Sequence, residues 1–207
     1  MKTYQPRKTI RLREYDYSQP GGYFVTICTK NREMIFGDVV DGEMRLSAIG
    51  AIASQCWQDM PIHFTAVELD EFVLMPNHVH GIIIILDNLK SQSSDPGRGV
   101  QLNTPTVDRF SRISPRRNSL GVVVRTYKAA VTTLCRNNGY PDFGWQRNYF
   151  EHIIRDDRSL SRIREYIASN PQRWMLDKEN PNRRGSDEFH RWLTATGSRA
   201  QWHTLRP

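Results

Sequence analysis

The first half of the chain alternates between apolar runs and polar turns in a pattern that predicts β-strands. Residues 23–29 are β-branched or aromatic and follow a Pro-Gly-Gly turn, which indicates a buried strand. The same reasoning predicts strands at 67–75 and 80–86, on either side of the turn-forming pair Pro76-Asn77. The longest apolar run, residues 81–86, is far shorter than the roughly 20 residues of a membrane span. We therefore expect a chain that does not cross a bilayer.

A hairpin and a helix are expected between the first two of these strands. Two short strand-like pieces between residues 34 and 46 flank Asp41-Gly42, a pair that favours a tight hairpin turn. Ser47 is a suitable helix cap, and apolar residues recur on one helical face over residues 48–60. Pro61 is expected to end this helix.

Helical periodicity returns in the second half of the chain. Apolar residues recur at i, i+3, i+4 and i+7 over residues 119–136. A strand is expected at 149–154, and Asp156-Asp157 begins a helix that runs to about residue 170, where Pro171 stops it. The order β-α-β-β-α-β predicts an α+β fold, the ferredoxin-like split βαβ sandwich with a central antiparallel sheet.

The 207 residues suit one domain with appendages. We predict an N-terminal arm at 1–20, a folded domain at 21–175 and a basic C-terminal tail at 176–207. Residues 88–118 are rich in Ser, Pro, Gly and Arg, which predicts a basic flexible insertion. That insertion is equally consistent with a solvated segment and with one that contacts DNA.

The charge of the chain points to a polyanionic partner. Lys and Arg number 29 against 22 Asp and Glu, which gives a net charge of +7 and a pI near 9.5. A basic protein concentrates polyanions and raises their encounter rate. Nucleic acid is the favoured partner, although charge alone does not separate DNA, RNA and acidic membranes.

The cysteines and the N-terminal residues bear on the compartment. Cys28, Cys56 and Cys135 form no C-x-x-C pair, so neither a zinc ribbon nor a disulfide framework is indicated. The first residues lack the apolar segment of a secretory signal. We therefore expect reduced thiols and a cytoplasmic location.

The pattern His78-Val79-His80 is the candidate metal site. Side chains two residues apart on a strand point to the same face, so the two imidazoles are expected to converge. The pattern alone is equally consistent with two core or surface histidines. Together with an oxygen ligand, such a pair suits Mg²⁺ or Mn²⁺, and the ion would polarise a phosphodiester.

Two helical tyrosines compete for the role of nucleophile. Tyr127 lies in the middle of the apolar stripe of its helix, which favours core packing. Tyr166 lies beside the stripe of its own helix, and Asn170 follows one turn later on the same face. A phenol and an amide oxygen could thus meet one metal-bound phosphate, where the cation would stabilise the phenolate.

Three ordered motifs resemble a known family. The segment Phe-Val-Leu-Met-Pro-Asn-His-Val-His at 72–80 resembles the HUH motif of the single-tyrosine transposases that act on single-stranded DNA. Within that family it is similar to the REP-associated tyrosine transposases. The segments at 145–152 and 164–171 are similar to later blocks of the family. The resemblance covers about residues 21–174.

The resemblance implies a ferredoxin-like catalytic core that uses Mg²⁺ or Mn²⁺ and no nucleoside triphosphate. It assigns the nucleophile to Tyr166, two metal ligands to His78 and His80, and the third ligand to Asn170, where many relatives have Gln. It further implies a 5′-phosphotyrosine intermediate with a free 3′-OH. The implied partners are single-stranded DNA hairpins in REP-like repeats, bound by a monomer or a homodimer.

Further residues are candidates for DNA contact, each with a solvated surface as the alternative. They are Arg125, Lys128, Arg147, Arg155, Arg162 and Arg173. His152 could bind metal, move a proton, contact phosphate or pack in the core.

Three functions are compared on these residues. The favoured one is a metal-dependent single-strand DNA endonuclease and strand-transferase. A catalytically inactive nucleic-acid-binding protein, acting as a repressor or structural factor, has no chemical need of His78, His80 and Tyr166. A hydrolase of small phosphodiesters would use water as its nucleophile and would not need the tyrosine. The presence of both histidines and Tyr166 favours strand transfer.

Overall fold

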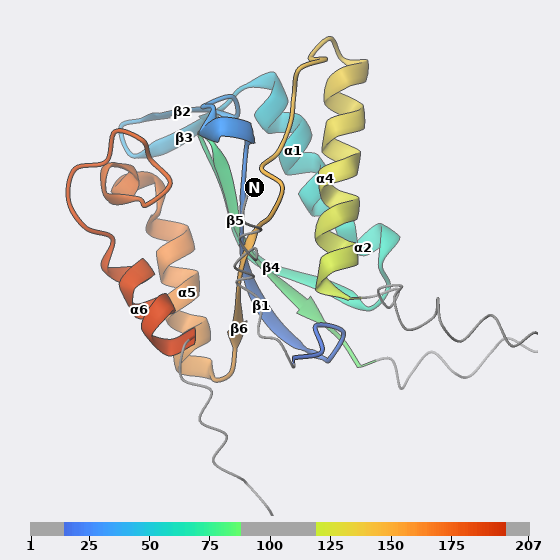
Figure 1. Cartoon of the computed structure of the whole chain (residues 1–207), viewed down its shortest axis with the longest axis vertical. Coiled ribbons are helices and arrows are strands. Elements are labelled where there is room, and N and C mark those ends of the chain that lie inside the picture. The colour runs from blue at the N-terminus through green and yellow to red at the C-terminus, as the bar shows by residue number, and fades with distance from the viewer. Residues whose placement is uncertain (1–14, 88–118, 198–207) are drawn as a thin grey trace, which may run out of the picture.

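Four antiparallel strands form the sheet on which the other elements pack. The computed structural model describes residues 15–87 and 119–197, so the predicted insertion at 88–118 lies outside the described residues (Figure 1). The strand order is β4-β5-β1-β6. The bounds are Gly21–Cys28 for β1, Val67–Met75 for β4, His78–Ile85 for β5 and Phe150–Ile154 for β6. This order confirms the predicted ferredoxin-like α+β arrangement.

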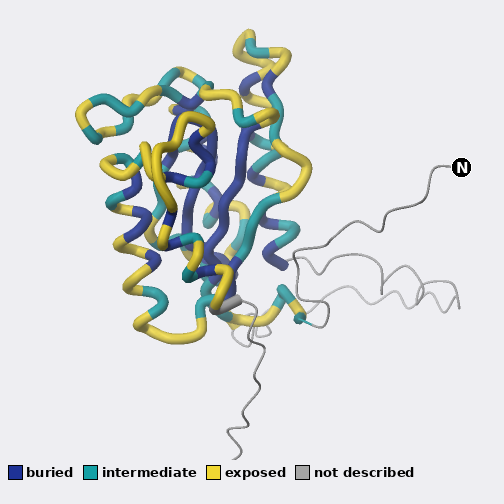
Figure 2. The backbone as a smooth tube through the Cα atoms, turned by 60° about the vertical axis from the view of Figure 1, so that its left-hand side comes forward, coloured by how far each residue is buried: buried dark blue, intermediate teal, exposed yellow. Residues whose placement is uncertain are grey.

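Strand alternation divides the sheet residues between two cores. The central strands β1 and β5 pair from Gly21 opposite Ile85 to Cys28 opposite His78. Because successive side chains point to opposite faces, neighbouring residues of one strand enter different cores. Figure 2 shows the buried residues concentrated along the strands and on the inner sides of the helices.

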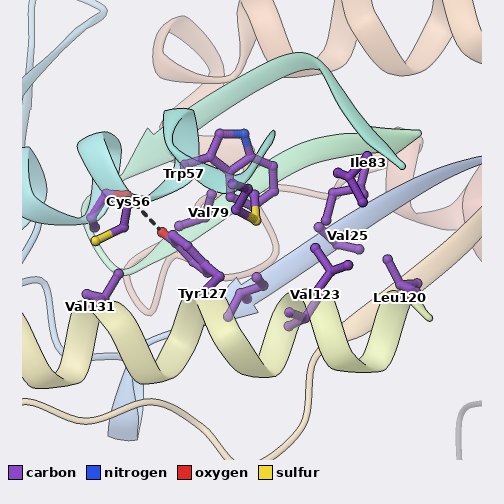
Figure 3. Close-up of a cluster of buried hydrophobic side chains, with 14 of the residues drawn as sticks. Val25, Cys56, Trp57, Val79, Ile83, Leu120, Val123, Tyr127 and Val131 are labelled. Carbon is purple, nitrogen blue, oxygen red and sulfur yellow. Dashed lines mark hydrogen bonds between the residues drawn. The ribbon is translucent and has the colours of Figure 1, made fainter. Parts of the chain in front are cut away.

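One core lies between the sheet and helices α1 (Ala48–Gln58) and α4 (Leu120–Asn137) (Figures 1 and 3). Tyr127 of α4 is fully buried there, and its hydroxyl donates to the carbonyl of Ala53 at 3.2 Å. The prediction that Tyr127 belongs to the core is therefore confirmed. No helix among residues 15–87 and 119–197, α4 included, has both the length and the hydropathy of a membrane span.

The second core lies on the other face, beneath α5 (Asp157–Ser169) and α6 (Glu188–Gly197). Asp156 caps α5 by accepting a hydrogen bond from the Ser159 amide at 2.7 Å. Ile163 and Ile167 of α5 pack here against the sheet. The segment that we predicted to be a C-terminal tail also contributes apolar side chains to this core, namely Phe189 and Leu193.

The hairpin prediction is confirmed, whereas one helix end is wrong. Strands β2 (Gly37–Val40) and β3 (Glu43–Leu46) meet at Asp41 and Gly42, whose φ angles of 54° and 78° fit a tight hairpin turn. Pro61 does not end α1. It lies in the first turn of a short second helix, α2 (Met60–His63), where its missing N–H breaks no helical hydrogen bond.

Gly81 of β5 has no side chain, and the ring of Trp57 from α1 fills the space where one would lie. A Cβ atom at Gly81 would lie 2.2 Å from Cζ2 of the fully buried Trp57. At Gly22 of β1, a Cβ atom would make only ordinary contacts of 3.5 Å with Ile154.

We predict that Gly81→Ala lowers the free energy of unfolding by about 1–3 kcal/mol, because the core has no room for the methyl group. Gly22→Ala is the matched control on the neighbouring strand and should change it by less than about 1 kcal/mol. Urea titration measures both values. Equal stability of the two variants would contradict the packing described here.

Candidate metal centre and tyrosine

The two histidines of the HUH-like motif both lie on β5 and converge as their spacing predicts. Their ring centroids are 4.3 Å apart, and both side chains are buried on the face beneath α5. The strand begins at His78, two residues earlier than we predicted, so both imidazoles follow the alternation of one regular strand.

The buried turn residue Asn77 fixes the tautomer of His78. Its amide nitrogen donates to the carbonyl of Glu179 at 2.8 Å, which leaves its Oδ1 facing Nδ1 of His78 at 2.8 Å. Since Oδ1 only accepts, Nδ1 of His78 carries the proton and Nε2 keeps a free lone pair. Nε2 is buried and has no hydrogen-bond partner among the described residues. A cation would satisfy this atom.

His80 is held from the neighbouring strand. Its Nδ1 lies 2.9 Å from the hydroxyl of Thr26, which is its partner in the β1–β5 register. Its Nε2 faces Asp177 Oδ2 at 3.5 Å. Each imidazole therefore has one nitrogen fixed by the protein and the other turned toward one point, as metal ligands require.

Asp177 is a candidate metal ligand that the sequence reasoning missed. It follows the 3₁₀ helix η3 (Pro171–Leu176) and is buried, with Oδ2 at 3.7 Å from Nε2 of His78. His78, His80 and Asp177 each offer one ligand atom, and these atoms lie within 4.8 Å of one another. This buried group could hold a metal ion. No motif spacing links Asp177 to the histidines, so only the tertiary fold reveals it.

The protonation states suit a cation. Burial lowers the pKa of His78 to about 3, although Asp177 opposes that shift, so His78 is neutral at physiological pH. Its contact with Asp177 is therefore not an ion pair. Burial alone would raise the pKa of Asp177, but His78, His80 and the Asn170 amide favour the carboxylate and hold that pKa below its usual range. Two imidazoles and one carboxylate can together bind a divalent ion.

Asn170, the predicted third ligand, lies beside Asp177 at the end of α5. Its Nδ2 donates to Asp177 Oδ2 at 2.9 Å, and its Oδ1 is buried without a partner among the described residues. An unpartnered buried oxygen fits a ligand role. That role stays a prediction, and Asp177 is a second candidate for the same coordination position.

Tyr166 reaches the same point from α5. Its hydroxyl lies 3.1 Å from Asp177 Oδ2, 3.4 Å from Nε2 of His80 and 3.4 Å from Asp187 Oδ2. Burial, with the charges of Asp177 and Asp187, raises the pKa of this phenol far above its ordinary value. The tyrosine is therefore protonated in this arrangement.

Tyr166 is more deeply buried than its place beside the apolar stripe suggested. Only 6% of the residue is exposed, because Phe189 of α6 stacks on its ring at 3.7 Å between centroids and 10° between planes. The cavity left around the hydroxyl is about 20 Å³. That space suits a water molecule rather than a nucleotide.

A bidentate pair ties the tyrosine helix to the edge of the sheet. Arg164 of α5 donates through Nε to Asp70 Oδ1 at 2.8 Å and through Nη2 to Oδ2 at 2.5 Å. Asp70 lies where the β4–β5 register shifts between Leu69 and Phe72, a bulge that turns its side chain toward α5. Arg164 lowers the pKa of Asp70.

The predicted DNA-contact residues are spread over both sides of the sheet. Arg125 and Lys128 lie on α4, whereas Arg162 lies on α5, across the sheet (Figure 1). The amine of Lys128 donates to the carbonyl of Gln146. The side chains of Arg147, Arg155 and Arg173 are exposed. These contacts stay predictions.

His152 and Arg162 both lie against Trp192 of α6. The guanidinium of Arg162 lies 4.5 Å from the centre of the Trp192 ring, and the His152 ring lies 6.0 Å from it. His152 is buried on β6, and burial lowers its pKa to about 4. The structure thus gives His152 a packing position, while its predicted role in DNA contact remains a prediction.

Comparison with known proteins identifies a relative by sequence and a solved structure with a similar fold. No family model matches the chain. An uncharacterized protein of Haemophilus influenzae is 42% identical to it over 174 residues, which are 83% of this chain and 92% of the relative. The two proteins belong to one family. The similarity therefore spans most of the chain rather than a single motif.

Among solved structures, the family has the fold of a REP-associated tyrosine transposase that was solved bound to a REP hairpin. The TM-score is 0.51 at 17% identity, and the match covers 80% of this chain and 74% of the other. The fold implied by the HUH-like motifs is therefore confirmed.

We predict that Mn²⁺ raises the melting temperature of the protein, because a ligand that binds only the folded state stabilises it. Asp177→Asn should weaken Mn²⁺ binding at least about tenfold, since it removes the one charged ligand. It should not destabilise the metal-free protein, because it also removes a buried charge. Titration calorimetry gives the affinity. If Asn170→Ala abolishes binding while Asp177→Asn leaves it intact, Asn170 rather than Asp177 is the third ligand.

Acid should destabilise the metal-free protein through His152. The unfolded chain binds a proton below a pKa of about 6.5, whereas folded His152 stays neutral down to about 4. The free energy of unfolding should therefore fall as the pH drops through this window. His152→Gln should reduce that slope by up to about 1.4 kcal/mol per pH unit. Urea titrations with a chelator present measure it, and an unchanged slope would show that folded His152 is charged.

Proposed function

We propose that this protein is a metal-dependent endonuclease and strand-transferase for single-stranded DNA, with Tyr166 as its nucleophile. The observation that carries the proposal is the position of the tyrosine hydroxyl, 3.1 Å from Asp177 Oδ2 and 3.4 Å from Nε2 of His80. A phenol held against a buried group of metal-ligand type is the arrangement that tyrosine-based phosphoryl transfer requires. A protein that only binds DNA has no need of it.

The residues present fit Mg²⁺ or Mn²⁺. His78, His80 and Asp177 would hold the ion, with Oδ1 of Asn170 as a further oxygen ligand. When bound, the ion would neutralise charge on the phosphodiester and favour the phenolate of Tyr166.

The proposed reaction exchanges one phosphoester bond for another. Tyr166 Oη bonds to the phosphorus of the scissile phosphodiester while the bond from phosphorus to the 3′-oxygen breaks. The products are a 5′-phosphotyrosine and a free 3′-OH. The phenolic proton passes to Asp187, whose Oδ2 lies 3.4 Å from the hydroxyl, and the departing 3′-oxygen takes up the proton that Asp187 has received, so no net proton is gained or lost. Attack by a second 3′-OH reverses the step and joins a new strand.

The chain supplies its own tyrosine to its own histidines. Only residues 155 and 156 separate β6 from α5, so α5 folds back onto the sheet that carries His80. A substrate can reach the hydroxyl only when the Phe189 side chain moves, because its ring covers that of Tyr166 and the remaining cavity holds no nucleotide. We therefore place a displacement of Phe189 before the chemical step.

The proposed substrate is single-stranded DNA that contains a hairpin, as in REP-like repeats. The structural neighbour was solved with a REP hairpin, and the net charge of +7 favours a polyanion. An inactive DNA-binding protein is the second candidate. It is favoured by the stacking of Phe189 on the Tyr166 ring, which blocks access to the hydroxyl.

We predict a covalent protein–DNA adduct when the protein meets Mn²⁺ and a labelled library of single-stranded hairpins with randomised flanks. Tyr166→Phe should lose the adduct on a denaturing gel, because it removes the attacking oxygen. Tyr127→Phe is the matched control and should keep the adduct, since that hydroxyl only bonds Ala53 in the core.

Two outcomes would contradict the proposal. An adduct formed by Tyr166→Phe would show that another residue is the nucleophile. Binding of hairpins by the wild-type protein without any adduct across the library would favour the inactive DNA-binding protein.

A further inference from the structure

A second pocket, much larger than the tyrosine cavity, opens beside it. Its volume is about 410 Å³, against about 20 Å³ around the Tyr166 hydroxyl. Four basic side chains line it, and we call it the cationic pocket: Arg32, Lys178, Arg183 and Arg191. None of these four was among the DNA contacts expected from the sequence. They come from three separate parts of the chain, η1 (Lys30–Arg32), the segment after η3, and α6, which only the fold brings together.

The cationic pocket and the tyrosine cavity share a wall. Lys178, Asp187 and His190 line both of them. The hydroxyl of Tyr166 lies 3.4 Å from Asp187, one of these shared residues. The two cavities are therefore adjacent, and a strand whose scissile phosphate lies at the tyrosine would have the cationic pocket beside it.

The charges around the pocket leave it electropositive. Its one lining carboxylate, Asp187, faces other groups, since Oδ2 lies near the Tyr166 hydroxyl and Oδ1 accepts the His190 amide at 3.0 Å. Arg191 forms an ion pair of little strength with exposed Glu188 at 3.5 Å, and it donates to the neutral Ser186 hydroxyl at 3.2 Å. The amine of Lys178 donates to Nε2 of His190 at 2.7 Å.

Arg32 is the exception, because Glu179 neutralises it at 2.8 Å. The charge available to a ligand therefore comes mainly from Lys178, Arg183 and Arg191.

The tyrosine cavity itself is acidic and cannot hold a strand by charge. Asp177, Glu179 and Asp187 line it, together with apolar rings such as those of Phe150 and Phe189. A single divalent ion would offset only part of that charge. A polyanionic strand needs basic neighbours nearby, and the adjoining cationic pocket supplies them.

We propose that the cationic pocket binds the phosphodiester backbone of single-stranded DNA next to the phosphate that Tyr166 attacks. This inference rests on the proposed function. The ligand is recognised by the charge of its backbone and not by its sequence, since the pocket is lined mainly by arginine and lysine side chains and His190 is its one ring-bearing lining residue. Its role is to position the flanking strand while the scissile phosphate lies at the tyrosine.

The test measures binding without chemistry. A fluorescent 12-nucleotide oligothymidylate is titrated with full-length Tyr166→Phe protein in EDTA, and anisotropy gives the dissociation constant at several salt concentrations. Arg183→Gln and Arg191→Gln are added to this background one at a time and together. Both side chains are exposed and contact neither the histidines nor the tyrosine, so the fold should survive, which melting temperatures check. Arg136→Gln, an exposed position on α4, is the charge-matched control.

Each pocket variant should weaken binding about fivefold at 0.1 M salt and make the slope of log affinity against log salt shallower by about 0.7, the value of one phosphate contact. The double variant should change the slope by about 1.4. Arg136→Gln should behave like the background protein. Pocket variants that match Arg136→Gln, or a background protein that does not bind the oligonucleotide, would overturn the proposal.

The experiments distinguish an error in the pocket proposal from an error in the catalytic proposal. If no adduct forms but the pocket variants still weaken binding, the pocket stands and catalysis by Tyr166 is wrong. If adducts form while the pocket variants bind normally, the tyrosine chemistry stands and the pocket assignment is wrong.

Discussion

One buried carboxylate governs the arrangement of this protein's site. Asp177 is 3% exposed, lies between two imidazoles, and is close to the hydroxyl of Tyr166 and the amide of Asn170. An ionised carboxylate at such depth is costly unless a positive charge compensates it. Hydrogen bonds from Tyr166 and Asn170 offset part of that cost, but the neutral imidazole of His78 cannot supply a full positive charge. A divalent cation can, and the lone pair left on His78 faces the place where it would bind.

The fold explains how these groups meet. The two-residue period of β5 brings both histidines beneath α5, and the opposite face of the same strand is left to the α1–α4 core. The Asp70–Arg164 pair fixes α5 to the sheet edge, so that its tyrosine reaches the strand. The segment after η3 then adds Asp177, and α6 closes over the ring of Tyr166. Acidic groups thus gather at the tyrosine and basic groups in the neighbouring pocket.

Features with a local cause could be predicted from the sequence, and features made by tertiary contacts could not. The convergence of the histidines follows from strand alternation, and the burial of Tyr127 follows from its helical stripe. Asp177 lies in an irregular segment without periodicity, so nothing in its neighbours indicates that it reaches β5. The stacking of Phe189 on Tyr166 is equally invisible, because α6 lies beyond the motifs. The prediction from Pro61 was wrong because proline is found both just after the end of a helix and in the first turn of a new one. Here it lies in the first turn of α2.

The central claim is that His78, His80 and Asp177 form a metal centre at which Tyr166 acts. Anomalous diffraction from crystals grown with Mn²⁺ tests it most directly. The account predicts one strong anomalous peak, from an ion within coordination distance of Nε2 of both histidines and of an oxygen of Asp177. The Tyr166 hydroxyl should lie beside this ion. A peak elsewhere, or none while Asp177 keeps its contact with the tyrosine hydroxyl, would contradict it.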